Sequence, residues 1–229
     1  MKTIGLIGGM SWESTVPYYR IINEIINRQL GGHHSAKIAM LSVDFAEIEE
    51  LQANGNWEKA GEILADATKK LELIGADFIV ICTNTMHKVL PQITAAITIP
   101  VLHIAVETAY ELLGAKMKKV ALLGTKYTME ADFYKNKIEE FGVNVIVPEE
   151  KDREMTNHII YDELCHGEIN PAARNKMVHI INKLMAQGAE GVILGCTELG
   201  LLIKEKDSPL PLFDTTEIHA TAAAVRALR

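Results

Sequence analysis

The segment from Gly75 to Thr85, GADFIVICTNT, returns in altered form as GAEGVILGCTE, from Gly188 to Glu198. At an offset of 188 − 75 = 113 residues, both copies begin with Gly-Ala and an acidic residue, continue as an apolar run and end in small polar side chains. A short apolar run bounded by turn residues is typical of a buried strand in a parallel sheet. In this alignment Thr83 lies opposite Cys196. The repeat therefore predicts a site built by two similar halves that face each other.

A second pair of segments repeats at almost the same distance. Residues 3–9 and 119–125 each contain an apolar run that ends in glycine, at an offset of 120 − 4 = 116. Around these runs, short apolar segments alternate with longer ones of helical periodicity, which predicts right-handed βαβ units. We therefore expect an α/β protein with two similar lobes, each a parallel sheet flanked by helices. A pseudo-two-fold axis is expected to relate the lobes, with the active site between them.

The repeats also predict how the chain divides. The first lobe is expected to span residues 1–114, with 205–229 packing back onto it. The second lobe is expected to span residues 115–204. In this interpretation the chain crosses between the lobes more than once.

The composition is that of an ordinary globular protein, since 48% of the 229 residues are hydrophobic and 23% are charged. A net charge of −7 argues against binding to a nucleic-acid backbone, which usually needs a basic face. The apolar runs are short and broken by charges, so none predicts a membrane span. Three cysteines, together with a first segment MKTIGLIGG that lacks a signal-peptide cleavage site, predict a reduced, cytoplasmic protein.

Cys196 is the strongest candidate for chemistry. Active sites in parallel α/β sheets lie at the carboxyl ends of the strands, and Cys196 follows the apolar run of the second repeat copy. A helix is predicted to start at this thiol, and its N-terminal N–H groups would lower the thiol pKa. The alternative is a buried structural cysteine, since thiols pack like small apolar groups.

Thr83 becomes a candidate through the repeat. Alone, a Thr-Asn-Thr sequence after a strand is an ordinary N-cap and turn. The alignment, however, places Thr83 opposite Cys196 and Asn84 opposite Thr197. Cys82 is one residue earlier and is predicted to point to the other face of its strand, where it would be buried in the packing. Hydroxyl and amide groups beside backbone N–H groups can hold a small carboxylate.

Other polar residues are weaker candidates. Cys165 is predicted to pack within a helix, and a cap or surface role is favoured for His87 and His103. Glu198 is predicted to lie in the first turn of a helix, from which it could still reach the site. Gln52 is interpreted either as a solvated loop residue or as an amide that touches the substrate.

The arrangement indicates a reaction type. No His/Cys cluster has metal-ligand spacing, and the chain has neither a phosphate-binding lysine loop nor a dinucleotide fingerprint, so no metal or cofactor is expected. Two acid/base groups across a cleft can remove a proton from one face of a carbon and return one to the other, which is racemisation or epimerisation. Donors around the substrate carboxylate would stabilise the charge that spreads into it.

The chain resembles the aspartate/glutamate racemase superfamily of cofactor-independent amino-acid racemases, essentially from end to end. The resemblance rests on IGLIGGMSWEST (4–15), TNTMH (83–87), LLGTKYT (122–128) and GCTELG (195–200). It implies an isomerase that needs no pyridoxal phosphate and acts on a small amino-acid substrate, with a homodimer as one possible state.

The resemblance also implies the roles of individual residues. Thr83 takes the place of the cysteine in the family's first motif, and Cys196 matches the second catalytic cysteine. These two residues are therefore expected to handle protons. The substrate contacts that the resemblance implies are Met10, Gln52, Asn84, Thr85 and Thr197.

One departure from the family bears on the substrate. Archaeal-type aspartate racemases grip the side-chain carboxylate with a basic residue after the second strand, whereas this chain has EIEELQ at 47–52, without Arg or Lys. A second family lysine corresponds to Cys165 or its neighbourhood. The sequence is thus closer to the bacterial branch with a Thr/Cys pair, whose members include acidic-amino-acid and broad-specificity racemases.

Other functions remain open at this point. A related enzyme of the same superfamily, such as a hydantoin racemase or a decarboxylase/isomerase, would use the same scaffold and a single cysteine. A non-enzymatic two-lobed protein that closes on a metabolite is a second possibility. A third is a flavodoxin-like domain that binds a phosphate ligand at Gly8-Gly9.

Overall fold

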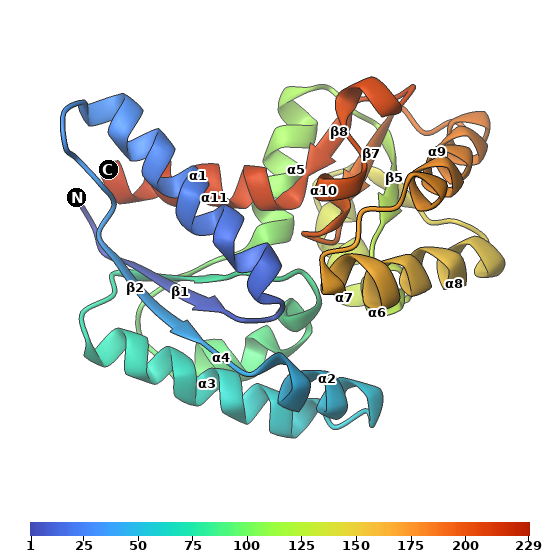
Figure 1. Cartoon of the computed structure of the whole chain (residues 1–229). Coiled ribbons are helices and arrows are strands. Elements are labelled where there is room, and N and C mark those ends of the chain that lie inside the picture. The colour runs from blue at the N-terminus through green and yellow to red at the C-terminus, as the bar shows by residue number, and fades with distance from the viewer. The chain divides into compact units, whose positions relative to one another are not determined.

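Both copies of the repeat form a strand in the computed structural model, which describes residues 1–229. The strands form two parallel sheets of four strands each (Figure 1). The first sheet has the order β2-β1-β3-β4 and consists of β1 (Ile4–Gly8), β2 (Ile38–Ser42), β3 (Phe78–Ile81) and β4 (Val101–Leu102). The second has the order β6-β5-β7-β8 and consists of β5 (Lys119–Leu123), β6 (Asn144–Ile146), β7 (Gly191–Leu194) and β8 (Leu212–Asp214). The predicted α/β class, with parallel sheets flanked by helices, is confirmed.

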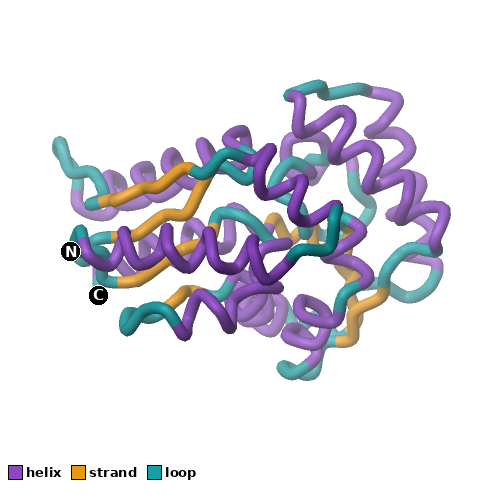
Figure 2. The backbone as a smooth tube through the Cα atoms, turned by 90° about the horizontal axis from the view of Figure 1, so that it is seen from below, coloured by secondary structure: helices purple, strands orange, loops and turns teal.

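Helices occupy most of the chain between the strands (Figure 2). Those before β5 are α1 (Trp12–Leu30), α2 (Phe45–Ala53), α3 (Trp57–Leu73), η1 (Thr85–Val89), α4 (Leu90–Ala95) and α5 (Ile104–Gly114). Those after β5 are α6 (Lys126–Glu130), α7 (Asp132–Glu139), α8 (Glu150–His158), η2 (Ile159–Glu163), η3 (Leu164–His166), α9 (Pro171–Ala186), α10 (Leu199–Leu202), η4 (Glu205–Asp207) and α11 (Thr215–Leu228). None of these helices combines the length and the apolar composition that crossing a bilayer requires.

The two copies of the repeat share their local geometry. Gly75 follows α3 and Gly188 follows α9, with φ angles of +93° and +92° that glycine adopts most readily. Two residues further on, the carboxylates of Asp77 and Glu190 each accept a backbone N–H from a neighbouring segment of their own sheet, at 2.6 and 2.7 Å. Equivalent helix ends and equivalent strand anchors therefore precede β3 and β7.

Residues of the first sheet alternate between two hydrophobic clusters, as the two-residue period of a strand requires. One face packs against α1 and α11 and is formed by Ile4, Leu6, Phe78, Val80 and Cys82. The opposite face packs against α3 and α4 and is formed by Ile7, Ile79 and Ile81. Helices α1 and α3 accordingly lie on opposite sides of this sheet (Figure 1). Cys82 is fully buried, which confirms its predicted packing role, and this burial raises the pKa of its thiol.

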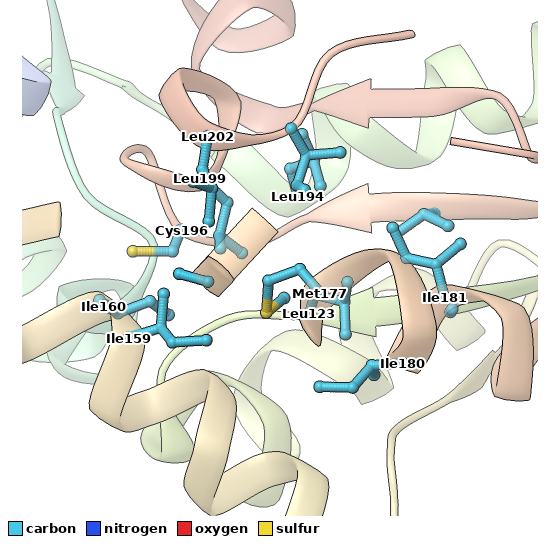
Figure 3. Packing of buried hydrophobic residues seen from close by; sticks show 14 of the residues in the cluster. Leu123, Ile159, Ile160, Met177, Ile180, Ile181, Leu194, Cys196, Leu199 and Leu202 are labelled. Atoms are coloured by element: carbon cyan, nitrogen blue, oxygen red, sulfur yellow. The ribbon is translucent and has the colours of Figure 1, made fainter. Parts of the chain in front are cut away.

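The second sheet repeats this layering. One face packs against α5 and α7 and is formed by Val120, Leu122 and Ile193. The other packs against α9 and its neighbours and is formed by Ala121, Leu123, Val192 and Leu194. Cys196 lies at the edge of this second cluster, with its sulfur directed away from Met177 (Figure 3). The thiol therefore lies on the same face of β7 as the packed residues, but the leucines and isoleucines of the cluster do not surround it.

Helices α5 and α11 do not pack on the sheet whose last strand precedes them. Helix α5 follows β4, but its apolar residues Ile104, Ala105, Ala109 and Leu112 join a cluster of the second sheet. Helix α11 follows β8, but its alanines Ala220, Ala223, Ala224 and Ala227 pack on the first sheet. The chain thus divides into a first unit, residues 1–103 with 219–229, and a second unit, residues 104–218.

This division differs from the borders at 114/115 and 204/205 that the sequence suggested. Strand β8 pairs with β7, so residues 212–214 belong to the second sheet rather than packing back with the C-terminus. Only the part of α11 from His219 onward belongs to the first unit. The periodicity of a helix indicates its apolar face but not which sheet covers that face.

Candidate active site

The carboxyl end of the first sheet carries several of the predicted site residues. Thr83, Asn84 and Thr85 follow β3 directly, and all three are buried. Met10 follows β1, the neighbouring strand, and is also buried. Since parallel strands end at the same edge of a sheet, these side chains belong to one end of the first unit.

Gln52 joins this group from helix α2. Its side chain is 4% exposed, and its Nε2 lies 3.0 Å from the Sδ of Met86, which shares a hydrophobic cluster with Met10. The interpretation of Gln52 as a solvated loop residue is therefore wrong. The remaining polar residues near it on α2 are exposed glutamates: Glu47, Glu49 and Glu50.

Glycine shapes the loop that carries Met10. Gly9 has a φ angle of +92°, and a side chain at this position would overlap the carbonyl oxygen of Val43. Its N–H donates to the Oγ1 of Thr15 in α1 at 2.9 Å. The loop is therefore held closely between β2 and the start of α1.

A histidine that lies beside two other histidines contacts the backbone of Thr83. His87 is 3% exposed, and its Nδ1 donates to the carbonyl oxygen of Thr83 at 2.9 Å. The ring centroids of His103 and His219 lie 4.8 and 6.0 Å from that of His87. Burial, followed by the proximity of these two rings, lowers the pKa of His87 well below its ordinary value. The surface role predicted for His87 is therefore wrong, because this ring is buried against the Thr83 backbone.

The carboxyl end of β7 carries the second group of site residues. Cys196, Thr197 and Glu198 follow this strand and are buried, with Glu198 only 3% exposed. The Oε2 atom of Glu198 accepts hydrogen bonds from the Sγ of Cys196 and the Oγ1 of Thr197, both at 2.8 Å. Its Oε1 atom lies 3.9 Å from the Sγ of Cys165. One carboxylate therefore lies against two thiols and a hydroxyl.

Two of these residues are more central than the sequence suggested. Cys165 packs against the hydrophobic cluster from η3, as predicted, but it is only half-buried and also contacts Glu198. The π-helical turn η2 precedes η3, and such turns are frequent at functional sites. Glu198 precedes α10 as its N-cap residue and directs its carboxylate to Cys196. The repeat contained a signal for Glu198, which aligns with Thr85, but none for Cys165.

Two glycines set the backbone beneath Cys196. The N–H of Gly195 donates to the carbonyl oxygen of Leu123 at 2.6 Å. A side chain on Gly124 would lie 3.0 Å from the carbonyl oxygen of Gly195, closer than ordinary packing allows. A side chain on Gly195 would in turn lie 2.9 Å from the carbonyl oxygen of Leu123, so glycine at both positions suits the close approach of the ends of β5 and β7.

The thiol of Cys196 is not activated in the way that the sequence suggested. Its pKa is raised well above the ordinary value, first by burial and then by the charges of Glu198 and Cys165. The backbone N–H of Glu198 does lower the pKa, as expected of a helix start, but burial and the carboxylate of Glu198 raise it by more. The thiol therefore stays protonated unless a neighbouring group takes its proton.

Thr83 and Cys196 occupy equivalent positions in the two units. Each follows a buried strand by the same count, and each is 8% exposed. In the first unit a hydroxyl follows β3, and in the second unit a thiol beside a carboxylate follows β7. These groups can take up and release protons, so this class of α/β protein is suited to acid/base chemistry. The chain matches the family model described as Asp/Glu/Hydantoin racemase over residues 7–223, and it belongs to this family.

Individual relatives agree with this membership. The chain is 25% identical to the broad specificity amino-acid racemase RacX of Bacillus subtilis, covering 93% of this chain and 92% of that protein. A crystal structure of a putative Asp/Glu racemase from Yersinia pestis is 53% identical over 100% of both chains, with a TM-score of 0.93. The structure of an aspartate racemase homologue from Pyrococcus horikoshii is 38% identical over 100% of both chains, with a TM-score of 0.86.

Proposed function

We propose that this protein is a cofactor-independent amino-acid racemase in which Cys196 and Thr83 handle protons on opposite faces of the α-carbon. The equivalence of the two positions carries the proposal, since both close a buried strand at an offset of 113 residues and are equally exposed. Inversion requires one group that removes the α-proton and another that delivers a proton to the opposite face. A thiol and a hydroxyl at equivalent strand ends fit these two roles.

The remaining predicted residues are assigned to substrate binding. Asn84 and Thr85 offer amide and hydroxyl groups, which can stabilise the charge that spreads into the α-carboxylate as the proton leaves. The hydroxyl of Thr197 donates to Glu198, so Thr197 is proposed to bind the substrate through its backbone N–H. Met10 and Gln52 are buried at the same end of the first unit as Asn84 and Thr85. They are proposed to contact the rest of the substrate.

The proposed substrates are aspartate, glutamate or a broader set of amino acids. Helix α2 has no Arg or Lys, so the family's grip on a side-chain carboxylate by a cation from this region is absent from its sequence. Its exposed glutamates leave the neutral amide of Gln52 as the buried polar group of the helix. Relatives named as an aspartate racemase homologue and as a broad specificity racemase support either range of substrates.

Two further parts of the proposal concern the cellular location and the oligomeric state of the enzyme. Cys82, Cys165 and Cys196 are all free thiols, in keeping with a reducing compartment, so we propose a cytoplasmic location. A homodimer is proposed from the family resemblance.

The test is a panel of L and D amino acids incubated with the enzyme in deuterated water. We expect deuterium to enter the α-position and the chirality to be lost at the same time, for both enantiomers of the accepted amino acids. Hydantoins form the second part of the panel, because the matching family includes hydantoin racemases. Deuterium exchange with hydantoins but with no amino acid would contradict the proposed substrate class.

The Thr/Cys pair predicts a difference between the two directions of proton removal. Racemisation itself conceals this difference, because an equilibrium constant of one forces the same kcat/KM from either enantiomer. A β-chloro amino acid avoids this constraint, since its α-carbanion expels chloride irreversibly. A thiol ionises far more readily than a threonine hydroxyl, so we expect about tenfold or faster chloride release from the enantiomer that faces Cys196. The resemblance assigns this enantiomer to the L form.

The substitution Thr83→Cys provides the matched comparison. It should raise chloride release from the D form toward that from the L form and leave the L rate nearly unchanged. Equal L and D rates in the unmodified enzyme, or a D rate that Thr83→Cys does not alter, would contradict the assigned asymmetry.

A further inference from the structure

The carboxylate of Glu198 has an unusual set of partners. Its Oε2 accepts from the thiol of Cys196 and the hydroxyl of Thr197, both at 2.8 Å, and its Oε1 faces the thiol of Cys165 at 3.9 Å. Glu198 and Cys196 come from the loop after β7, whereas Cys165 comes from η3. The carboxylate thus lies within hydrogen-bonding reach of two thiols from different parts of the second unit.

This arrangement creates a charge problem for a reacting thiol. If Cys196 lost its proton to solvent, a thiolate and a carboxylate would lie 2.8 Å apart in a buried site. Two like charges at such a separation strongly oppose each other's ionisation. A site built only to generate a thiolate would not be expected to hold a carboxylate against its sulfur.

Transfer of the proton within the pair avoids this problem. Moving one proton from sulfur to oxygen leaves the total charge of the pair at minus one. No second negative charge is then buried, and the two atoms need not move, since the hydrogen bond between them already exists. Pairs that share one proton in this way titrate as a unit rather than as separate groups.

We propose that Glu198 is the group that accepts the Cys196 proton, so that the thiolate forms by transfer within the pair rather than by loss to solvent. This inference rests on the proposed role of Cys196 and deepens it. In the activating step the S–H bond of Cys196 breaks and an O–H bond forms on Oε2 of Glu198. The new carboxyl O–H then donates back to the thiolate sulfur.

The remaining bonds are consistent with this step. A protonated Oε2 keeps one lone pair, which can still accept the Thr197 hydroxyl. Oε1 stays available to the thiol of Cys165. When the thiolate takes the substrate α-proton, the S–H bond is restored and the substrate carries the electron pair. Cys165 and Thr197 therefore act as positioning groups that orient the carboxylate.

The first test is the pH profile of alkylation of Cys196 by iodoacetamide in the full-length enzyme, resolved by mass spectrometry from Cys82 and Cys165. A pair that shares a proton gives a constant fraction of thiolate across neutral pH. We therefore expect a plateau of reactivity around neutral pH, followed by a second rise in alkali. A single titration at high pH without a plateau would overturn the proposal.

The substitution Glu198→Gln gives the sharper contrast. Glutamine keeps the size of the side chain but cannot take a proton at neutral pH. We expect the plateau to disappear and alkylation of Cys196 at neutral pH to slow about tenfold or more. If Glu198 served only to hold the loop, removal of its negative charge would make Cys196 ionise more readily, and alkylation would become faster. The two roles thus predict opposite signs.

Two controls keep the result interpretable. Glu190→Gln removes a carboxylate from the start of the same repeat copy, where it binds backbone N–H groups. It should leave the alkylation profile of Cys196 unchanged. Glu198→Asp keeps an ionisable group but shortens its reach, and should restore part of the plateau. Because the readout is alkylation, the inference fails or holds independently of whether amino acids are racemised.

Discussion

Replacement of Cys196 by alanine is expected to lower α-proton exchange and racemisation by about 10³-fold, since general acid/base groups commonly contribute 10²- to 10⁴-fold. Of the three cysteines, Cys196 alone follows the carboxyl end of a strand with its sulfur at the edge of a hydrophobic cluster (Figure 3). In the proposed mechanism, removal of its side chain leaves Thr83 without a partner base. The measurement is the initial rate of deuterium incorporation with L and D substrate.

Cys82→Ala is the matched control for this prediction. Cys82 is also a buried cysteine after a strand, and it lies one residue before Thr83, but its sulfur packs in the cluster shared by α1 and α11. We expect a loss of about 1–2 kcal/mol in the free energy of unfolding, with little change in rate. Equal losses of activity from the two substitutions would mean that Cys196→Ala acts through stability rather than through chemistry.

The substitution Cys196→Ser tests whether activity needs the acidity of the thiol or only a side chain of similar shape. A serine hydroxyl can keep the hydrogen bond to Glu198 but ionises far less readily than a thiol. We expect a well-folded variant with a loss of rate close to that of the alanine variant. Nearly full activity in the serine variant would contradict a thiolate base at this position.

The sequence carried enough information to predict both strands of the repeat and the equivalent positions of the residues that follow them. This succeeds because the signals are local: a glycine ends each preceding helix, an acidic residue binds the adjacent segment, and an apolar run is buried on both faces. The same locality placed Thr83 and Cys196 at equivalent positions. This equivalence follows from the period of the chain rather than from any single motif.

The assignment of helix α5 to a unit was beyond such local reasoning. Its position directly after β4 placed it in the first lobe, but its apolar face packs on the second sheet. The C-terminal segment was expected to pack back onto the first lobe, and the alanines of α11 do pack on the first sheet. Strand β8, which was expected to accompany α11, pairs with β7 instead.

The environment of the site residues was also hidden from the sequence. The pKa of Cys196 depends on its burial and on the direction of the Glu198 side chain, and neither follows from spacing. Gln52 and His87 looked exposed because polar residues usually are. Both are buried because a specific partner, the sulfur of Met86 or the carbonyl of Thr83, meets them in the folded chain.

The buried histidines of the first unit predict that the protein loses stability in acid. His219 accepts a hydrogen bond from Tyr18 at 2.9 Å through Nδ1 and donates to the carbonyl oxygen of Leu102 at 3.0 Å through Nε2. This arrangement suits the neutral ring, because the carbonyl oxygen can only accept. Burial lowers the pKa of His219 to about 3 and also lowers that of His87.

The direction of the effect follows from which state, folded or unfolded, binds the proton first as the pH falls. In the unfolded chain a histidine has a pKa of about 6.5, so as the pH falls the unfolded state takes up a proton that folded His219 refuses. The stability is therefore complete above about pH 6.5 and is lost progressively as the pH falls toward 3. For His219 alone, the expected loss in the free energy of unfolding is about 2 kcal/mol by pH 5 and about 4 kcal/mol by pH 3. His87 adds a loss of the same sign.

Urea unfolding at several pH values between 8 and 5 measures this effect. His219→Gln should be less stable at pH 8, because the ring fills a buried position, but its stability should fall less steeply toward pH 5. Tyr18→Phe is the matched control, since it removes the hydrogen bond to Nδ1 and leaves the titrating ring in place. It should keep the steep pH dependence. Identical slopes in the unmodified protein and in His219→Gln would show that the acid sensitivity arises elsewhere, since this ring would then bind protons equally in the folded and unfolded states.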